Sequence, residues 1–215
     1  MKQEIRTELR RARRQLGAGE LGERAERLAR VLAEAVPVRS RVLGYLPMPG
    51  EPDVLEFLEL HHARGGEVLV PVIAGGRRMD WVRWSPQTPT RRSLFAPVDE
   101  PEGERLPLRT VLEGGLASRE VLEGGLAPRA GLDDNPVPLT VLVPALALDV
   151  AGNRLGQGGG YYDSMFGPQG AAPEADARFI GVVHSEELLS PGSFEVHPHD
   201  LRVPEVATEQ GLRLL

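Results

Sequence analysis

The sequence predicts an α/β protein whose three layers are an open, mainly parallel sheet and helices on both of its faces. Short apolar runs of strand length alternate with segments of helical periodicity, and Pro and Gly residues separate them. This alternation is typical of βαβ units, in which crossover helices cover a parallel sheet. Residues 1–215 are expected to form a single domain, because this length is ample for one packed core.

The N-terminal part of the chain predicts two helices. Residues 2–16 place apolar side chains at helical spacing on one face, at Ile5, Leu9, Ala12 and Leu16. The segment 21–36 repeats the pattern with Leu21, Ala25, Leu28, Leu32 and Val36. Gly17 and Gly19 mark the turn between the two predicted helices.

The next segment predicts the first βαβ unit. Residues 41–46 form a short apolar run that ends before Pro47, which indicates a buried strand. Residues 52–64 are expected to be a helix, because they begin with a proline suited to a first turn and end before two glycines. Residues 67–73 and 79–84 are the following strand candidates.

Residues 85–139 are rich in Pro, Gly and charged side chains and have weak periodicity. They contain two near-identical copies of a ten-residue segment, VLEGGLASRE at 111–120 and VLEGGLAPRA at 121–130. Two copies are too few for a solenoid. We interpret residues 102–137 as a surface insertion in which one segment was duplicated, because surface loops tolerate insertions well.

The C-terminal third of the chain predicts the remaining strands. Residues 140–148 form the most apolar run and are expected to be a central strand. A glycine-rich loop and a short helix follow, and the segments 178–183 and 203–207 predict two more strands.

Composition limits the classes of function. Hydrophobic residues make up 41% and charged residues 26%, as in ordinary globular proteins, while the net charge of −6 argues against non-specific nucleic-acid binding. The absence of Cys excludes disulfides, thiolate zinc sites and Cys nucleophiles. With no signal-peptide pattern and no apolar run of membrane-spanning length, we expect a cytoplasmic monomer without membrane partners.

The glycine-rich loop carries the clearest functional pattern. Five of the nine residues 152–160 are Gly, so the backbone can approach a ligand closely and aim its N–H groups at phosphates. Arg154 adds a guanidinium suited to phosphate oxygens, and Asp163 could hold Mg²⁺. The loop lacks the Gly-Lys-Ser/Thr ending of a Walker A motif, and Tyr161 stands where a dinucleotide fingerprint needs its third Gly.

Other candidate residues remain ambiguous when they are taken alone. Lys2, Arg6 and Arg10 lie four apart on one helical stripe, which fits a solvated basic face as well as an anion site. Glu51 by itself fits a helix-capping acid. The three histidines His184, His197 and His199 lack the spacing of a transition-metal site, and Trp81 and Trp84 fit packing residues.

The string VPALALDVAGNRLGQGGGYYD, from Val143 to Asp163, resembles the signature of the 5-formyltetrahydrofolate cyclo-ligase (methenyltetrahydrofolate synthetase) family. The resemblance extends to both ends of the chain and leaves out only residues 102–137. It implies an enzyme that uses ATP and Mg²⁺ to convert 5-formyltetrahydrofolate into 5,10-methenyltetrahydrofolate, ADP and phosphate. The small-molecule substrates are then the only expected partners.

The resemblance also implies site residues, with Arg154 and Glu51 in catalytic roles. The implied ATP-binding residues are Lys2, Gln3, Glu4, Ile5, Arg6, Arg154, Leu155, Gly156, Gln157, Gly158, Gly159, Gly160, Tyr161 and Tyr162. The implied folate-binding residues are Leu46, Glu51, Gln157, Gly158, Gly159, Gly160 and Tyr161. Asp163 and Asp200, the latter in a His-Asp pair, are the implied Mg²⁺ ligands.

The sequence departs from the family pattern at three positions. Val54 stands where Thr is usual, Ser164 replaces a basic residue, and Gln157 occupies a position that is often Tyr or basic. These departures bear on affinity and substrate preference. Two other functions stay open: a catalytically silent nucleotide- or folate-binding relative, and a sugar-phosphate isomerase or CoA-transferase-like enzyme on a similar sheet, which would not hydrolyse ATP.

Overall fold

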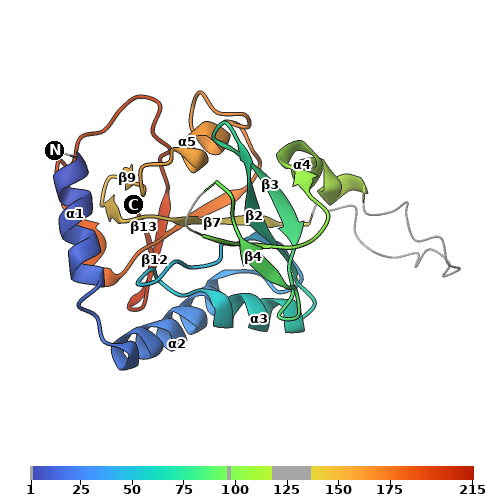
Figure 1. Ribbon diagram of the computed structural model, residues 1–215, viewed down its shortest axis with the longest axis horizontal. Helices are drawn as coiled ribbons and strands as arrows, with labels where there is room; N and C mark the ends of the chain where they lie inside the picture. The colour runs from blue at the N-terminus through green and yellow to red at the C-terminus, as the bar shows by residue number, and fades with distance from the viewer. Residues whose placement is uncertain (1, 96–97, 118–136) are drawn as a thin grey trace, which may run out of the picture.

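An eight-stranded sheet forms the centre of the protein, as a computed structural model describes it for residues 2–95, 98–117 and 137–215 (Figure 1). Its strands follow the order β13 (Gly211–Leu214), β12 (Glu205–Thr208), β10 (Arg178–Val182), β7 (Leu139–Pro144), β1 (Arg41–Leu43), β2 (Glu67–Gly75), β3 (Arg78–Arg83) and β6 (Leu106–Pro107). The strands from β12 to β2 run parallel, whereas β13, β3 and β6 pair antiparallel at the edges. The predicted α/β class is confirmed.

Helices cover both faces of the sheet, because neighbouring residues of a buried parallel strand point to opposite sides and both are apolar. Val42 packs in a core with α2 (Ala18–Ala35) and α3 (Leu55–Ala63). Leu43 packs in a second core with α4 (Leu108–Ala117) and α5 (Tyr161–Phe166). Figure 1 shows α2 and α3 below the sheet and α4 and α5 above it. Within the described residues, no helix has both the length and the apolar character required to cross a membrane.

The prediction of one strand over residues 140–148 was wrong in its extent. Strand β7 ends at Pro144, and the chain continues into β8 (Ala147–Asp149) of a small second sheet with β9 (Arg154–Leu155) and β11 (Leu188–Leu189). The apolar run is continuous because all three residues of β8 are buried as well. The small sheet matters for the site because it carries Arg154 at the entrance to the glycine-rich loop.

The segment interpreted as an insertion contains a packed element. Helix α4 includes the first seven residues of the first repeat copy, and its Leu108 and Val111 are buried in the core that also contains Trp81. Before this segment, β4 (Thr90–Arg92) and β5 (Asp99–Pro101) pair as a short hairpin. The second copy, 121–130, lies outside the described residues, so the interpretation of the repeat as a surface insertion stays a prediction.

Candidate active site

Positive φ angles explain why glycines gather in the loop between β9 and α5. Gly158 has φ 112° and Gly160 has φ 70°, both in the region that side chains with a Cβ rarely adopt. Gly160 is the residue that precedes helix α5, so the turn into the helix depends on it. The cluster that the sequence analysis singled out is therefore a backbone turn that requires glycine.

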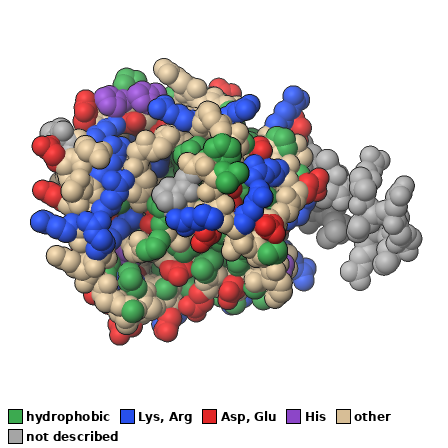
Figure 2. All heavy atoms as spheres, in the orientation of Figure 1, with side chains coloured by type: hydrophobic (Ala, Val, Ile, Leu, Met, Phe, Trp, Pro, Cys, Tyr) green, Lys and Arg blue, Asp and Glu red, His purple; other side chains and the backbone are tan. Residues whose placement is uncertain are grey.

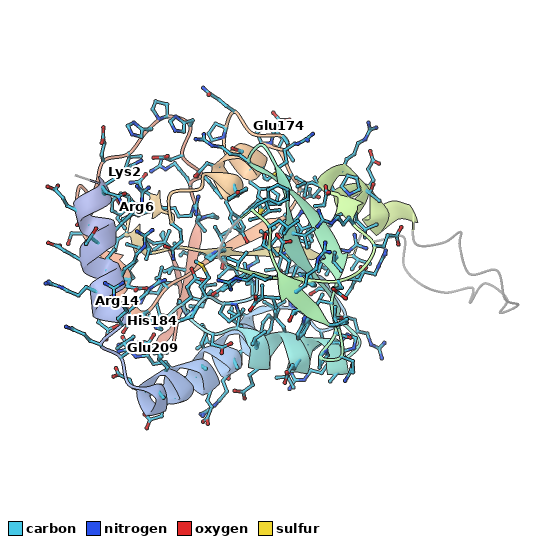
Figure 3. The ribbon with its side chains drawn as sticks, in the orientation of Figure 1. Lys2, Arg6, Arg14, Glu174, His184 and Glu209 are labelled. Atoms are coloured by element: carbon cyan, nitrogen blue, oxygen red, sulfur yellow. The ribbon has the colours of Figure 1, made fainter. Side chains whose placement is uncertain are left out.

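Helix α1 (Lys2–Arg13) lies against this loop and points its cationic stripe at it. Lys2 Nζ is 2.8 Å from Asp200 Oδ2, Arg6 Nε donates to the Gly156 carbonyl at 2.9 Å, and Arg10 Nη2 donates to the Gln157 carbonyl at 2.7 Å. Figure 3 labels Lys2 and Arg6 on α1, and Figure 2 shows Lys and Arg side chains gathered over this helix. The alternative of a purely solvated basic face was wrong.

Some side chains in the first turns of α1 face the glycine-rich loop and others face solvent. Ile5 packs in the cluster that contains Leu155, next to the glycine-rich loop. Gln3 and Glu4, which the resemblance includes among ATP-binding residues, have exposed side chains. The structure thus brings Ile5 and Arg6 to the loop and Lys2 to Asp200 by side-chain contact, and it turns the side chains of Gln3 and Glu4 outward.

Arg154 is a buried cation at the base of the loop. Its side chain is 4% exposed, Nη2 is 2.8 Å from Asp163 Oδ1, Nη1 donates to the Pro144 carbonyl, and the guanidinium carbon lies 5.6 Å from the centre of the Tyr162 ring. Arg154 Nε and the Tyr162 hydroxyl are buried without a hydrogen-bond partner in the described part of the chain. Burial raises the pKa of Tyr162 well above its ordinary value, so this hydroxyl stays protonated.

Asp163 and Asp200 come together although they lie far apart in the sequence. The backbone N–H of Leu201, next to Asp200, donates to Asp163 Oδ1 at 3.0 Å. Asp200 Oδ2 accepts from Lys2 and from the His197 N–H. Burial tends to raise the pKa of Asp200, but these two hydrogen bonds, together with the electrostatic effect of Lys2 and His199, lower the pKa below its usual value.

Glu51 is a buried acid, 7% exposed, in the turn before α3. Its Oε2 accepts from the Met48 N–H at 3.0 Å, and its Oε1 accepts from Gln157 Nε2 at 2.8 Å. The interpretation of Glu51 as a helix-capping acid was wrong, because Asp53 Oδ1 accepts the Leu55 N–H at the start of α3. Glu51 instead meets the glycine-rich loop.

Arg13 is an important residue that the sequence analysis missed. Its side chain is 5% exposed; Nε and Nη2 bind the two carboxylate oxygens of Glu187 at 2.6 and 2.8 Å, and Nη2 also donates to the Ala145 carbonyl. Nη1 is 3.9 Å from Glu51 Oε1. The available signal was position, since Arg13 follows Leu9 by four residues and so lies on the apolar face of the helix.

A groove borders the segment that leads to Glu51. It has a volume of about 360 Å³, and its walls include Leu46, Met48, Leu55 and Trp84. A larger hollow of about 730 Å³ between β3, α4 and α5 is lined by none of the predicted site residues. The smaller groove is therefore the better candidate for substrate, because it adjoins the predicted folate residues.

Comparison with known proteins identifies the family. A model of the 5-formyltetrahydrofolate cyclo-ligase family matches residues 1–128 and 132–209. The chain belongs to this family. The match also includes most of the segment 102–137, which the resemblance had left out.

Curated relatives and solved structures agree with the cyclo-ligase family. The chain is 27% identical over 212 residues to 5-formyltetrahydrofolate cyclo-ligase of Mycolicibacterium smegmatis, a match that covers 96% of this chain and 93% of the relative. It is 37% identical over 83 residues to the mitochondrial 5-formyltetrahydrofolate cyclo-ligase of Arabidopsis thaliana, covering 37% of this chain and 30% of the relative.

Two solved 5,10-methenyltetrahydrofolate synthetases share the fold. The structure from Aquifex aeolicus has a TM-score of 0.66 at 23% identity and covers 99% of this chain and 92% of its own. The structure from Mycoplasma pneumoniae has a TM-score of 0.65 at 15% identity, with coverage of 97% and 98%. The cyclo-ligase family thus accounts for the fold over nearly the whole chain.

Asp163 and Asp200 carry carboxylate oxygens, the type of ligand that Mg²⁺ prefers. Among the described residues, no group of three or more His, Asp or Glu side chains is placed so that it could hold a metal ion. Mg²⁺, however, is commonly held by one or two carboxylates together with phosphates and water. Asp163 Oδ1 and Asp200 Oδ2 make the hydrogen bonds described above, and Asp200 Oδ1 lies 3.7 Å from His199 Nε2.

Gly167→Ala is expected to destabilise the protein by about 1–3 kcal/mol, the usual effect of overpacking. Gly167 has φ −66°, so alanine would otherwise be tolerated, but an added Cβ would lie 2.5 Å from the Asp163 carbonyl and 2.7 Å from the His199 carbonyl. These backbone atoms belong to the segments that carry the two aspartates. Urea denaturation measures the effect.

Gly22→Ala in the exposed interior of α2 is the matched control, because nothing lies within 4 Å of its added Cβ. We expect it to stabilise the protein by up to about 1 kcal/mol through helix propensity. Equal stabilities of Gly167→Ala and the original protein would contradict the close packing of the two segments.

Proposed function

We propose that the protein catalyses the ATP-dependent cyclisation of 5-formyltetrahydrofolate to 5,10-methenyltetrahydrofolate, with release of ADP and phosphate. One observation carries the proposal in a chain of the cyclo-ligase family. Arg6 and Arg10 of α1 contact the glycine-rich loop at Gly156 and Gln157, and Glu51 contacts it at Gln157. The Arg154–Asp163 pair flanks the same loop, and Lys2 contacts Asp200.

The chemistry explains why such a reaction uses ATP. The formyl oxygen is a poor leaving group, so its direct displacement by N10 of the folate is slow. Transfer of the γ-phosphoryl group of ATP to this oxygen gives an imidate phosphate and ADP. Attack by N10 on the activated carbon closes the ring, and loss of the phosphate together with the N10 proton leaves the methenyl bridge. Such a phosphoryl transfer needs positioning and charge neutralisation more than covalent help from the protein.

The cations of the site are suited to the phosphates. Lys2, Arg6 and Arg154 would neutralise phosphate oxygens, with the amides of residues 155–162 close by. Asp163 and Asp200 would hold Mg²⁺. When bound, the ion would supply further neutralisation of the phosphate charge.

The remaining predicted residues are suited to the folate. Glu51 presents a carboxylate to which the N–H groups of a pterin ring can donate, and such charge-assisted hydrogen bonds are strong. Leu46 would contact the ring system from the wall of the groove. Residues 157–161 would border both substrates, since the loop meets Glu51 on one side and α1 on the other.

A turnover assay tests the proposed function. With ATP, Mg²⁺ and 5-formyltetrahydrofolate present, we expect the absorbance of 5,10-methenyltetrahydrofolate to rise while ADP forms in equal amount. Omission of ATP, or addition of a metal chelator, should abolish the rise. Product formation without ADP would favour the isomerase or transferase alternative, and no turnover by the folded protein would favour a silent relative. Equal rates with and without the chelator would overturn the Mg²⁺ assignment.

A further inference from the structure

The side chain of Gln157 joins Glu51 to helix α1. Its Nε2 donates to Glu51 Oε1 at 2.8 Å, while its Oε1 accepts from Arg10 Nε at 3.2 Å and from Arg10 Nη2 at 3.1 Å. Both ends of the amide are therefore engaged. The three residues come from distant parts of the chain, so the contact is a product of the fold and belongs to no local turn.

Gln157 is the more accessible partner in its contact with Glu51. Glu51 is 7% exposed, whereas Gln157 is only partly buried. Glu51 also has a charged neighbour, Arg13. Arg13 Nη1 is 3.9 Å from Glu51 Oε1 and has no hydrogen-bond partner in the described part of the chain. Oε1 of Glu51 thus accepts its short hydrogen bond from a side chain of the loop that is expected to border substrate.

We propose that Gln157 is an internal stand-in for the substrate, occupying the acceptor oxygen that the pterin ring N–H groups take when folate binds. This inference rests on the proposed function. A carboxamide N–H on a carboxylate is the same donor–acceptor chemistry as a ring N–H or amino group on a carboxylate. Substrate binding then exchanges one donor for another, and Gln157 must leave Glu51 before the ring can engage it.

Arg10 allows this exchange while the backbone conformation of the loop is kept. Its Nη2 donates to the backbone carbonyl of Gln157 at 2.7 Å as well as to the side-chain oxygen. When the amide leaves Glu51, the backbone contact can persist, and Arg6 still holds the neighbouring Gly156 carbonyl. The side chain can therefore move while the phosphate-facing backbone keeps its shape.

We call the form with the Gln157–Glu51 hydrogen bond closed and the form without it open. The stand-in lowers the apparent affinity for folate, because the closed form does not bind it. The apparent dissociation constant equals the intrinsic one divided by the fraction of open protein, so a closed form populated to about 90% weakens binding about tenfold. Position 157 then sets how tightly folate binds. A side chain that cannot reach Glu51 removes the competition.

The test is calorimetric titration of 5-formyltetrahydrofolate, without ATP, into the original protein, Gln157→Ala and Gln157→Asn. We expect both variants to bind about three- to tenfold more tightly, since alanine has no donor and asparagine is one methylene too short to keep both contacts. Gln15→Ala, at an exposed position on the turn after α1, is the control and should leave the dissociation constant unchanged.

The outcomes separate the two proposals. Equal or weaker binding by Gln157→Ala and Gln157→Asn, with the original protein still binding, overturns the stand-in while the proposed function stands. Weaker binding would make Gln157 a direct substrate contact, and equal binding would show that its side chain has no net effect on folate affinity. No binding by any of the folded proteins overturns the proposed function and the stand-in with it.

Discussion

Arg154→Ala is expected to lower kcat/KM at least about a hundredfold, the range seen when one preorganised charge-stabilising donor is removed. The Arg154 guanidinium is held in place by Asp163 and by the Pro144 carbonyl, and its Nε is buried without a partner. A donor that is already oriented stabilises the charge that develops during phosphoryl transfer without reorganisation at the moment of reaction. Steady-state kinetics with ATP and 5-formyltetrahydrofolate measure the loss.

Arg202→Ala is the matched control for this experiment. Arg202 is exposed and donates to the carbonyl of Ala151, just before the loop, and it is none of the proposed site residues. We expect its kcat/KM to change less than about twofold, as for a surface substitution away from special contacts. A loss of tenfold or less in a folded Arg154→Ala variant would show that Arg154 does not act on the phosphates.

Arg13→Met is expected to lower the free energy of unfolding by about 3–5 kcal/mol, because removing one partner of a buried ion pair leaves the other charge uncompensated. The side chains of Arg13 and Glu187 are 5% and 6% exposed, so water cannot replace the lost guanidinium. The Ala145 carbonyl loses its donor as well. Urea denaturation at neutral pH measures the change.

The double variant Arg13→Met, Glu187→Met separates the charge from the packing. We expect it to recover only part of the lost stability: well-packed apolar side chains of similar volume often replace a buried pair at little cost, but the Ala145 carbonyl and the His184 N–H remain without their side-chain partners. Arg14→Met is the control, since Arg14 directly follows Arg13 at the end of α1 and is exposed. A loss below about 1 kcal/mol for Arg13→Met would be typical of an exposed pair and would contradict the burial of this one.

The ion pair also matters for the site. Glu187 Oε2 accepts from the His184 N–H, and His184 Nε2 donates to the Gly50 carbonyl, next to Glu51. The end of α1 is thereby connected to the turn that presents the proposed folate-binding acid. Loss of Arg13 should consequently disturb folate binding along with stability.

The amount predictable from the sequence differs between the centre and the edges of the sheet. The strands β1, β2, β7 and β10 were predicted because central parallel strands are buried on both faces and appear as apolar runs. Strand β13 was missed because two of its four residues are exposed, which leaves no such run. The division between β7 and β8 was missed because both are buried and no polar residue separates them.

The sequence by itself determined the local features of this protein. Glycines at positive φ shape the loop, cations four residues apart share one face of α1, and the signature from Val143 to Asp163 indicates the family; each depends on residues that are close along the chain. Only the tertiary structure decided which charges are buried and which segments meet. The contact of Gln157 with Glu51 joins residues 106 positions apart, and that of Arg13 with Glu187 joins residues 174 apart. Such contacts depend on strand order and on the docking of α1, and local periodicity carries no record of either.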